Sequence, residues 1–343
     1  MKHLLMLSCA VCVFNIQPAH AETAIDPALQ KMAACKKLQD PEAYKSSKLE
    51  TFKMMLAGKD GWIFRTGPDF KMDFSFDASS IAKLQKIQKL LADKGISFYI
   101  AYLPNRGIMA PAYLPDNSDI AKAYDAKQAK TSYKNTVKTL QDADLNIITL
   151  DHDVPAEKFF RKTDQHWSTN GAREFAKTVA AVLKKDKSYD DIQKMEFETT
   201  SKGPYSFNGR FGESIQKLCG ITLAQEQDEE TVTAPKVKGG AEAGLFGDAP
   251  KPSITLIGTS FSRSAQLDTN FLGFLKEYTQ ADIYDATISG GGIDDPLIAY
   301  LSSADFKTSP PKMIVWEIPG HYVLARKDAL FLDEIVPSAL GEC

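Results

Sequence analysis

Two short segments carry residues that could perform acyl chemistry together. The first follows an apolar run at 253–257 and reads GTSFS, so Ser260 stands just past an expected strand, after a glycine and before an expected helix. A serine hydroxyl in that place points out of the sheet edge, and a helix N-terminus beyond it stabilises developing negative charge. Capping of the helix by Ser260 or Ser262 is the structural alternative.

The second segment, TDQHWS at 163–168, could supply the base for such a serine. His166 could take the hydroxyl proton, and Asp164 could hold the imidazole in the tautomer that accepts it. His152, which follows a strand end, and His321 compete for the same role, and a hydrogen-bonded structural histidine is the alternative for each. A serine and an Asp-x-His pair at the carboxyl ends of two parallel strands are what a hydrolase or acyltransferase site requires.

Alternating strands and helices would position these residues. Near-continuous apolar runs are typical of strands buried on both faces of a parallel sheet, and the segments between them have helical spacing. This alternation predicts an α/β fold with helices on both faces of a central parallel sheet, where ligands bind at the carboxyl ends of the strands. We expect strands at 96–103, 146–150, 253–257, 281–286 and 313–316, and helices at 79–93, 119–142, 168–185, 264–277 and 295–303.

Three other segments fall outside this pattern. Residues 26–56 are polar and compatible with helices, and we expect them to pack on the outside. Residues 58–64 read as a turn feeding a short strand. Residues 225–250 begin with an acidic run and contain a Gly-Gly pair, which predicts a solvated, flexible loop within the domain. We therefore expect a single domain at 22–343.

The first 21 residues have the pattern of an export signal. Lys2 supplies the positive start, an apolar run covers 4–16, and Ala19 and Ala21 are the small residues that a signal peptidase recognises. We predict cleavage before Glu22 and a periplasmic protein, with an uncleaved anchor as the alternative. The apolar run is shorter than the roughly 20 residues of a membrane span.

The cysteines should form one disulfide if the protein is exported to an oxidising compartment. Cys9 and Cys12 lie in the export signal, which leaves Cys35, Cys219 and Cys343. Two of these three should pair. The sequence permits any pairing; we favour a Cys35–Cys219 disulfide, with the last residue of the chain unpaired.

Composition excludes several classes of protein. The 343 residues include 41 basic and 44 acidic side chains, so a phosphate backbone would meet no general excess of positive charge, and nucleic acid is not an expected partner. With 5 His, 5 Cys and none of the usual ligand spacings, we expect no metal and no other cofactor.

Five motifs together resemble the AlgX/AlgJ-like alginate O-acetyltransferase family of the SGNH hydrolase superfamily. Besides the two segments above, they are residues 58–64 (GKDGWIF), 104–107 (PNRG) and 316–319 (WEIP). The resemblance spans 55–325 and implies a three-layer SGNH-like fold. Related proteins can carry a C-terminal carbohydrate-binding module, whereas this chain ends at Cys343, so we expect the catalytic domain alone.

The order of the motifs implies a circular permutation, because the Asp-x-His pair precedes the serine. Under this resemblance, Gly290 and Gly291 in the SGGG segment take the place of the oxyanion glycine, and backbone N–H groups of Ser260 and Gly290 would stabilise the oxyanion. The turn at 316–321 takes the place of a Gly-x-Asn-Asp block, although its asparagine is missing. An ordinary tight turn is the alternative for the glycines.

The remaining motif residues are candidates for substrate contacts: Asn105, Arg106 and Trp316. Arg106 could bind a polymer carboxylate or form a structural ion pair, and we favour the structural role. Trp316 and Glu317 could instead serve packing and a buried salt bridge. The lysine-rich segment 83–94 reads as a solvated helix face.

These observations predict a periplasmic O-acetyltransferase that uses an acetyl-serine intermediate. His166, oriented by Asp164, would deprotonate Ser260, and a sugar hydroxyl would then attack the acetyl-enzyme. The resemblance implies an alginate-like exopolysaccharide as substrate, acetyl groups delivered through a membrane-bound O-acyltransferase, and a place near a polysaccharide export complex. The alternatives are an acetylesterase with the same three residues and a non-catalytic scaffold of the export complex.

Overall fold

A five-stranded parallel sheet forms the centre of the molecule, with strand order β4-β3-β9-β7-β8. The computed structural model describes residues 27–45, 49–52, 54–116, 118–236, 252–262, 271–322 and 331–341. All five expected strands form, which confirms the predicted α/β fold. Their bounds are β3 (Ser97–Leu103), β4 (Ile147–Ile148), β7 (Ile254–Gly258), β8 (Ile283–Thr287) and β9 (Met313–Pro319).

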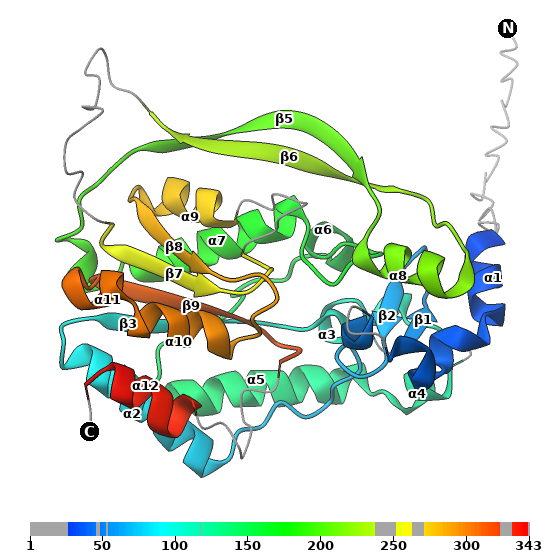
Figure 1. Ribbon diagram of the computed structural model, residues 1–343, viewed down its shortest axis with the longest axis horizontal. Helices are drawn as coiled ribbons and strands as arrows, with labels where there is room; N and C mark the ends of the chain where they lie inside the picture. The colour runs from blue at the N-terminus through cyan, green and yellow to red at the C-terminus, as the bar shows by residue number, and fades with distance from the viewer. Residues whose placement is uncertain are drawn as a thin grey trace, which may run out of the picture.

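Helices cover both faces of this sheet (Figure 1). Helices α7 and α9 pack together on one face, while α2, α5, α10 and α12 lie on the other. The helices are α1 (Pro27–Ala34), α2 (Ala78–Ala92), α3 (Arg106–Met109), α4 (Asp119–Ala123), α5 (Ala126–Asp142), α6 (Ala156–Phe159), α7 (Thr169–Leu183), α8 (Arg210–Cys219), α9 (Phe271–Thr279), α10 (Asp294–Ser302), α11 (Ala304–Thr308) and α12 (Val336–Ala339). None of the described helices is long and apolar enough to cross a bilayer.

The sequence of helix α7 explains where this helix begins and how it is held against the core. Its N-cap Ser168 accepts a hydrogen bond from the Gly171 N–H, which satisfies one of the backbone donors that a helix start leaves open. Phe175, Val179 and Leu183 repeat every four residues and are fully buried. The helix therefore begins directly after the 163–168 segment and is anchored in the core.

The helix expected at 119–142 is two helices. Helix α4 ends before Tyr124, and α5 begins at Ala126. The break arises at Asp125, whose carboxylate accepts hydrogen bonds from the Lys127 and Gln128 N–H groups and so starts a new helix.

The loop prediction for 225–250 is wrong for its first part. Residues 226–235 form β6 (Glu226–Pro235), which pairs antiparallel with β5 (Phe197–Phe207). This two-stranded ribbon lies outside α7 and α9 (Figure 1). The acidic run was misleading because several of its carboxylates bind other parts of the chain. Residues 237–250 lie outside the described residues.

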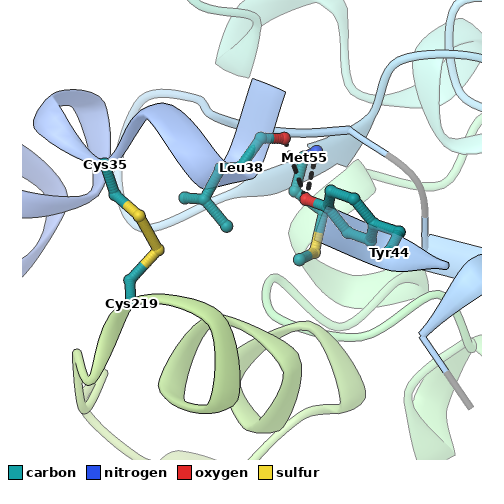
Figure 2. Close-up of a disulfide and its surroundings, with 5 residues drawn as sticks. All are labelled: Cys35, Leu38, Tyr44, Met55 and Cys219. Carbon is teal, nitrogen blue, oxygen red and sulfur yellow. Dashed lines mark hydrogen bonds between the residues drawn. A yellow bond between two sulfur atoms is a disulfide. The ribbon is translucent and has the colours of Figure 1, made fainter. Parts of the chain in front are cut away.

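The N-terminal segment forms a second, smaller core with α8. Strands β1 (Met55–Ala57) and β2 (Ile63–Arg65) make a hairpin beside it. The Tyr44 hydroxyl donates to the Leu38 carbonyl at 2.8 Å and accepts from the Met55 N–H (Figure 2). The same figure shows the disulfide between Cys35 and Cys219, the pairing favoured from the sequence. The segment 1–21, predicted to be an export signal, and Cys343 lie outside the described residues.

Candidate active site

Ser260, His166 and Asp164 form a hydrogen-bonded row. The His166 Nε2 lies 2.9 Å from the Ser260 Oγ, and the His166 Nδ1 lies 2.6 Å from the Asp164 Oδ1. With the proton on Nδ1, the imidazole donates to the carboxylate and presents Nε2 as an acceptor for the serine hydroxyl. Asp164 and His166 are buried, while Ser260 is half-buried. This geometry suits proton transfer from the serine to the imidazole.

The loop that holds the histidine is closed by backbone hydrogen bonds. Phe160 and Trp167 form an antiparallel bridge, and the Arg161 N–H donates to the His166 carbonyl at 3.2 Å. Trp167 is fully buried and packs against Phe261, whose ring centroid lies 5.0 Å from that of His166. The imidazole is therefore attached to the hydrophobic core on one side.

The Asp164 carboxylate is held at both oxygens. Its Oδ1 also accepts from the His166 N–H at 3.0 Å, and its Oδ2 accepts from the Arg210 N–H at 2.8 Å, at the start of α8. Burial opposes ionisation of this group, but the charge of His166 and the hydrogen bonds from His166 and Arg210 hold the pKa of Asp164 below its ordinary value. Asp164 is therefore a carboxylate across the neutral range.

Arg106 holds the loop that carries Asp164 in place through hydrogen bonds to backbone carbonyls. Its guanidinium donates to the carbonyls of Arg161, Lys162 and Asp164, and to that of Ile63 on β2. Only 1% of the residue is exposed, which favours the structural role over contact with a polymer. Burial lowers its pKa to about 10, which leaves it charged at neutral pH. The structural role is the one that the structure supports.

Asn105 and Trp316 also have structural roles in place of the expected substrate contacts. The Asn105 side chain caps α3 by accepting from the Ile108 N–H and donates to the Pro68 carbonyl. Trp316 lies in the middle of the sheet and is fully buried against Phe98. Asn105 is 3% exposed and Trp316 0%, which favours structural roles for both.

Gly290 and Gly291 lie in the turn between β8 and α10. The Ile288 N–H donates to the Gly258 carbonyl, which brings this turn to the same sheet edge as Ser260. Gly290 is exposed and has a φ of 85°, a conformation that favours glycine. Within the described chain no hydrogen bond joins either glycine to Ser260, and their oxyanion role stays a prediction.

The two competing histidines are placed differently. His152 is exposed, pairs with Asp151 at 2.6 Å and lies 3.5 Å from Glu174. His321 also packs against Phe261, at a distance of 5.7 Å between ring centroids. Burial, followed by the positive charges of Arg65, His166 and Lys71, holds the pKa of His321 well below its ordinary value.

Sequence reasoning missed the acidic residues of β6 that organise the site. Glu226 accepts from the Lys162 N–H and from the N–H and hydroxyl of Thr163. Asp228 pairs with Arg161 at 2.7 Å. No local signal identifies these contacts, because they join segments about sixty residues apart in sequence. Helix α8 did carry a signal: Phe211, Ile215 and Leu218 have helical spacing.

Comparison with known proteins places this arrangement in a family. Residues 55–320 match the family model for the SGNH hydrolase-like domain of acetyltransferase AlgX. The chain belongs to this family. The AlgX family match runs from β1 to the end of β9 and so includes all five strands of the sheet and the Ser260, His166 and Asp164 positions.

Individual AlgX and AlgJ proteins agree with this assignment. The alginate biosynthesis protein AlgX of Pseudomonas aeruginosa is 33% identical over 98% of this chain and 70% of its own length. Its solved structure superposes on 90% of this chain and 71% of its own, with a TM-score of 0.75 and 31% identity. The probable alginate O-acetylase AlgJ of the same species is 27% identical over 80% of this chain and 71% of its own. The chain spans 60–70% of the length of the curated AlgX proteins that it matches.

Proposed function

We propose that this chain is a periplasmic O-acetyltransferase that transfers acetyl groups to an alginate-like exopolysaccharide through an acetyl-Ser260 intermediate. One observation carries the proposal: the Ser260 Oγ lies 2.9 Å from the Nε2 of a histidine whose Nδ1 is held by a buried carboxylate. The names of the AlgX and AlgJ relatives support alginate and O-acetylation as the setting.

The reaction proceeds in two half-reactions. The Ser260 Oγ attacks the acetyl carbonyl as His166 Nε2 takes its proton, and the donor leaves with that proton. A sugar hydroxyl then attacks the acetyl-serine, again losing its proton to His166, and the ester is transferred while Ser260 regains its hydroxyl proton. Asp164 stabilises the imidazolium in both steps. Amides of Ser260 and Gly290 are the proposed oxyanion donors.

The proposed acetyl donor and partners rest on the resemblance to the AlgX/AlgJ-like family. This resemblance implies that acetyl groups are passed across the membrane by a membrane-bound O-acyltransferase. The polymer would be met as it passes through a polysaccharide export complex.

Product analysis tests the proposal. The protein is incubated with an activated acetyl ester and polymannuronate oligomers, and acetylated oligomers are measured against free acetate. We expect oligomer acetylation that Ser260→Ala abolishes. Release of acetate alone would make the protein an acetylesterase. Product levels in the wild type and in Ser260→Ala that both equal those of a reaction without protein would leave only the scaffold function.

A further inference from the structure

A buried carboxyl group lies beneath the turn that carries Ser260. Glu317 follows Trp316 on β9, and Trp316 pairs with Ile257 on the neighbouring strand β7. Glu317 is 0% exposed. Its Oε2 accepts from the Thr259 N–H at 2.8 Å and from the Ser262 hydroxyl at 3.0 Å. The carboxyl group therefore binds the chain on both sides of the serine.

A second layer of hydrogen bonds completes the turn. The Thr259 hydroxyl donates to Glu317 at 3.1 Å and accepts from the Phe261 N–H at 3.1 Å. The Ser262 N–H donates to the Thr259 carbonyl. Because each neighbour of Ser260 is bound either to Glu317 or to Thr259, the backbone that sets the direction of the Ser260 side chain depends on one carboxyl group.

The Glu317 carboxyl group leaves no room for a Cβ at position 258. A Cβ at this position would lie 2.8 Å from the Glu317 Oε2 and 2.9 Å from the Ser262 Oγ, closer than van der Waals contact allows. The lack of a side chain at Gly258 is what allows Glu317 to approach the backbone.

Burial of Glu317 carries a cost. Within the described chain no Lys, Arg or His side chain forms an ion pair with it. Burial raises the pKa of Glu317 to about 7, although the hydrogen bonds from Thr259 and Ser262 act in the opposite direction. An apolar side chain of similar size would fill the space without this desolvation. The hydrogen bonds to the turn are what distinguishes a carboxyl group here.

We propose that Glu317 is a positioning residue for the nucleophile. Its carboxyl group fixes the 258–262 turn so that the Ser260 Oγ stays within hydrogen-bonding distance of His166. Glu317 contacts neither donor nor acceptor and acts only through Thr259 and Ser262. This inference rests on the proposed function for its kinetic consequences, although its structural content does not.

Three variants test the inference by the rate of acetylation of Ser260 with an activated ester. Glu317→Gln can place its amide oxygen where Oε2 stands and so keep the acceptor for both the Thr259 N–H and the Ser262 hydroxyl, and it should retain a rate close to that of the wild type. Glu317→Leu removes both acceptors, and we expect kcat to fall about 10- to 100-fold with little change in KM, as for a reacting atom displaced by part of an ångström.

Thr255→Val is the matched control. Thr255 is buried at the other end of β7, where its hydroxyl is 2.8 Å from that of Tyr300. Removing this hydrogen bond should lower the melting temperature and leave kcat unchanged. An unchanged kcat in Glu317→Leu, an equal loss in Thr255→Val, or no rescue by Gln would overturn the proposal.

Hydrogen exchange separates this inference from the proposed function. Even if the wild type forms no acetyl-serine, exchange of the amides in 258–262 reports on the turn directly. Glu317→Leu should speed exchange at Thr259 and Phe261, while Glu317→Gln and Thr255→Val should not. Equal protection of this turn in all four proteins would refute the positioning role.

Discussion

Asp164 accepts three hydrogen bonds, and all three come from N–H groups: the His166 ring and backbone, and the Arg210 backbone. An asparagine in this place would turn one acceptor oxygen into a donor facing another donor. The imidazole would then lose the tautomer that presents Nε2 to Ser260.

We therefore predict that Asp164→Asn lowers kcat for acetyl transfer by about 10³-fold or more, since catalysis depends on that tautomer. Acetate release from an activated ester measures it. Asp151→Asn is the control, because Asp151 also binds a histidine at 2.6 Å but at the surface. Similar losses in both variants would contradict the assignment of His166.

The raised pKa of Glu317 predicts that the stability of the folded protein falls as the pH rises. Its pKa rises from 4.5 in the unfolded chain to about 7 in the folded protein. Between these values the folded state holds a proton that the unfolded state releases, so its contribution to stability is present below 4.5 and is lost as the pH rises towards 7. The slope is at most about 1.4 kcal/mol per pH unit.

The free energy of unfolding of the wild type minus that of Glu317→Gln should fall with rising pH across this window and be level on either side. Urea unfolding from pH 4 to 8 measures the difference. A difference that does not change with pH would show that Glu317 keeps its ordinary pKa.

At the scale of elements, Arg106 connects the start of α3 with β2 and the Asp164 loop. Its planar guanidinium reaches carbonyls on two segments at once, which the single ammonium of a lysine cannot do. We predict that Arg106→Lys costs more than about 2 kcal/mol of stability, because buried carbonyls lose their donors.

The same variant should also acetylate Ser260 more slowly, because Asp164 loses its support. Thermal unfolding and the acetylation rate are measured together. Lys177→Gln provides the control, since Lys177 is a solvent-exposed partner of Glu174 on α7. A fully stable Arg106→Lys protein would contradict the structural role.

Local patterns predicted the elements that surround the site but not the contacts between them. The segments at β3 and β7 are near-continuous apolar runs, so the sequence pattern located both strands within one or two residues. The strand β6 was missed because its first half is rich in acidic residues and resembles a solvated segment. Its carboxylates bind Arg161 and Thr163 from a distant part of the chain, and no local pattern reports that.

The three chemistry-bearing residues were predictable for a related reason. Ser260 and His166 each follow an element whose end is visible in the sequence, and parallel strands bring such ends to one edge. The contacts of Glu317 and of the Arg210 amide were not predictable from the sequence. Each joins two residues that are distant in sequence and come together only in the folded chain.

At the scale of the whole molecule, a covalent bond closes the second, smaller hydrophobic core. The disulfide between Cys35 and Cys219 connects the N-terminal segment to the last residue of α8, across 184 positions of sequence. The first residue of the same helix holds Asp164. Stability and site geometry are therefore linked through α8.

We predict that Cys35→Ser with Cys219→Ser lowers the free energy of unfolding by about 2–5 kcal/mol, because an unfolded chain without the bond gains conformational freedom. Thermal unfolding of the double variant measures this. Addition of reductant should destabilise the wild type and leave the double variant unchanged. A wild type equally stable in reductant would contradict a stabilising role for the bond.

Mass spectrometry of the acetylated protein tests the central claim most directly. After incubation with an activated acetyl ester, peptide analysis should find one acetyl group on Ser260 in the wild type and none in a folded His166→Ala variant. An acetyl group on another residue, or equal acetylation of Ser260 without His166, would contradict the account.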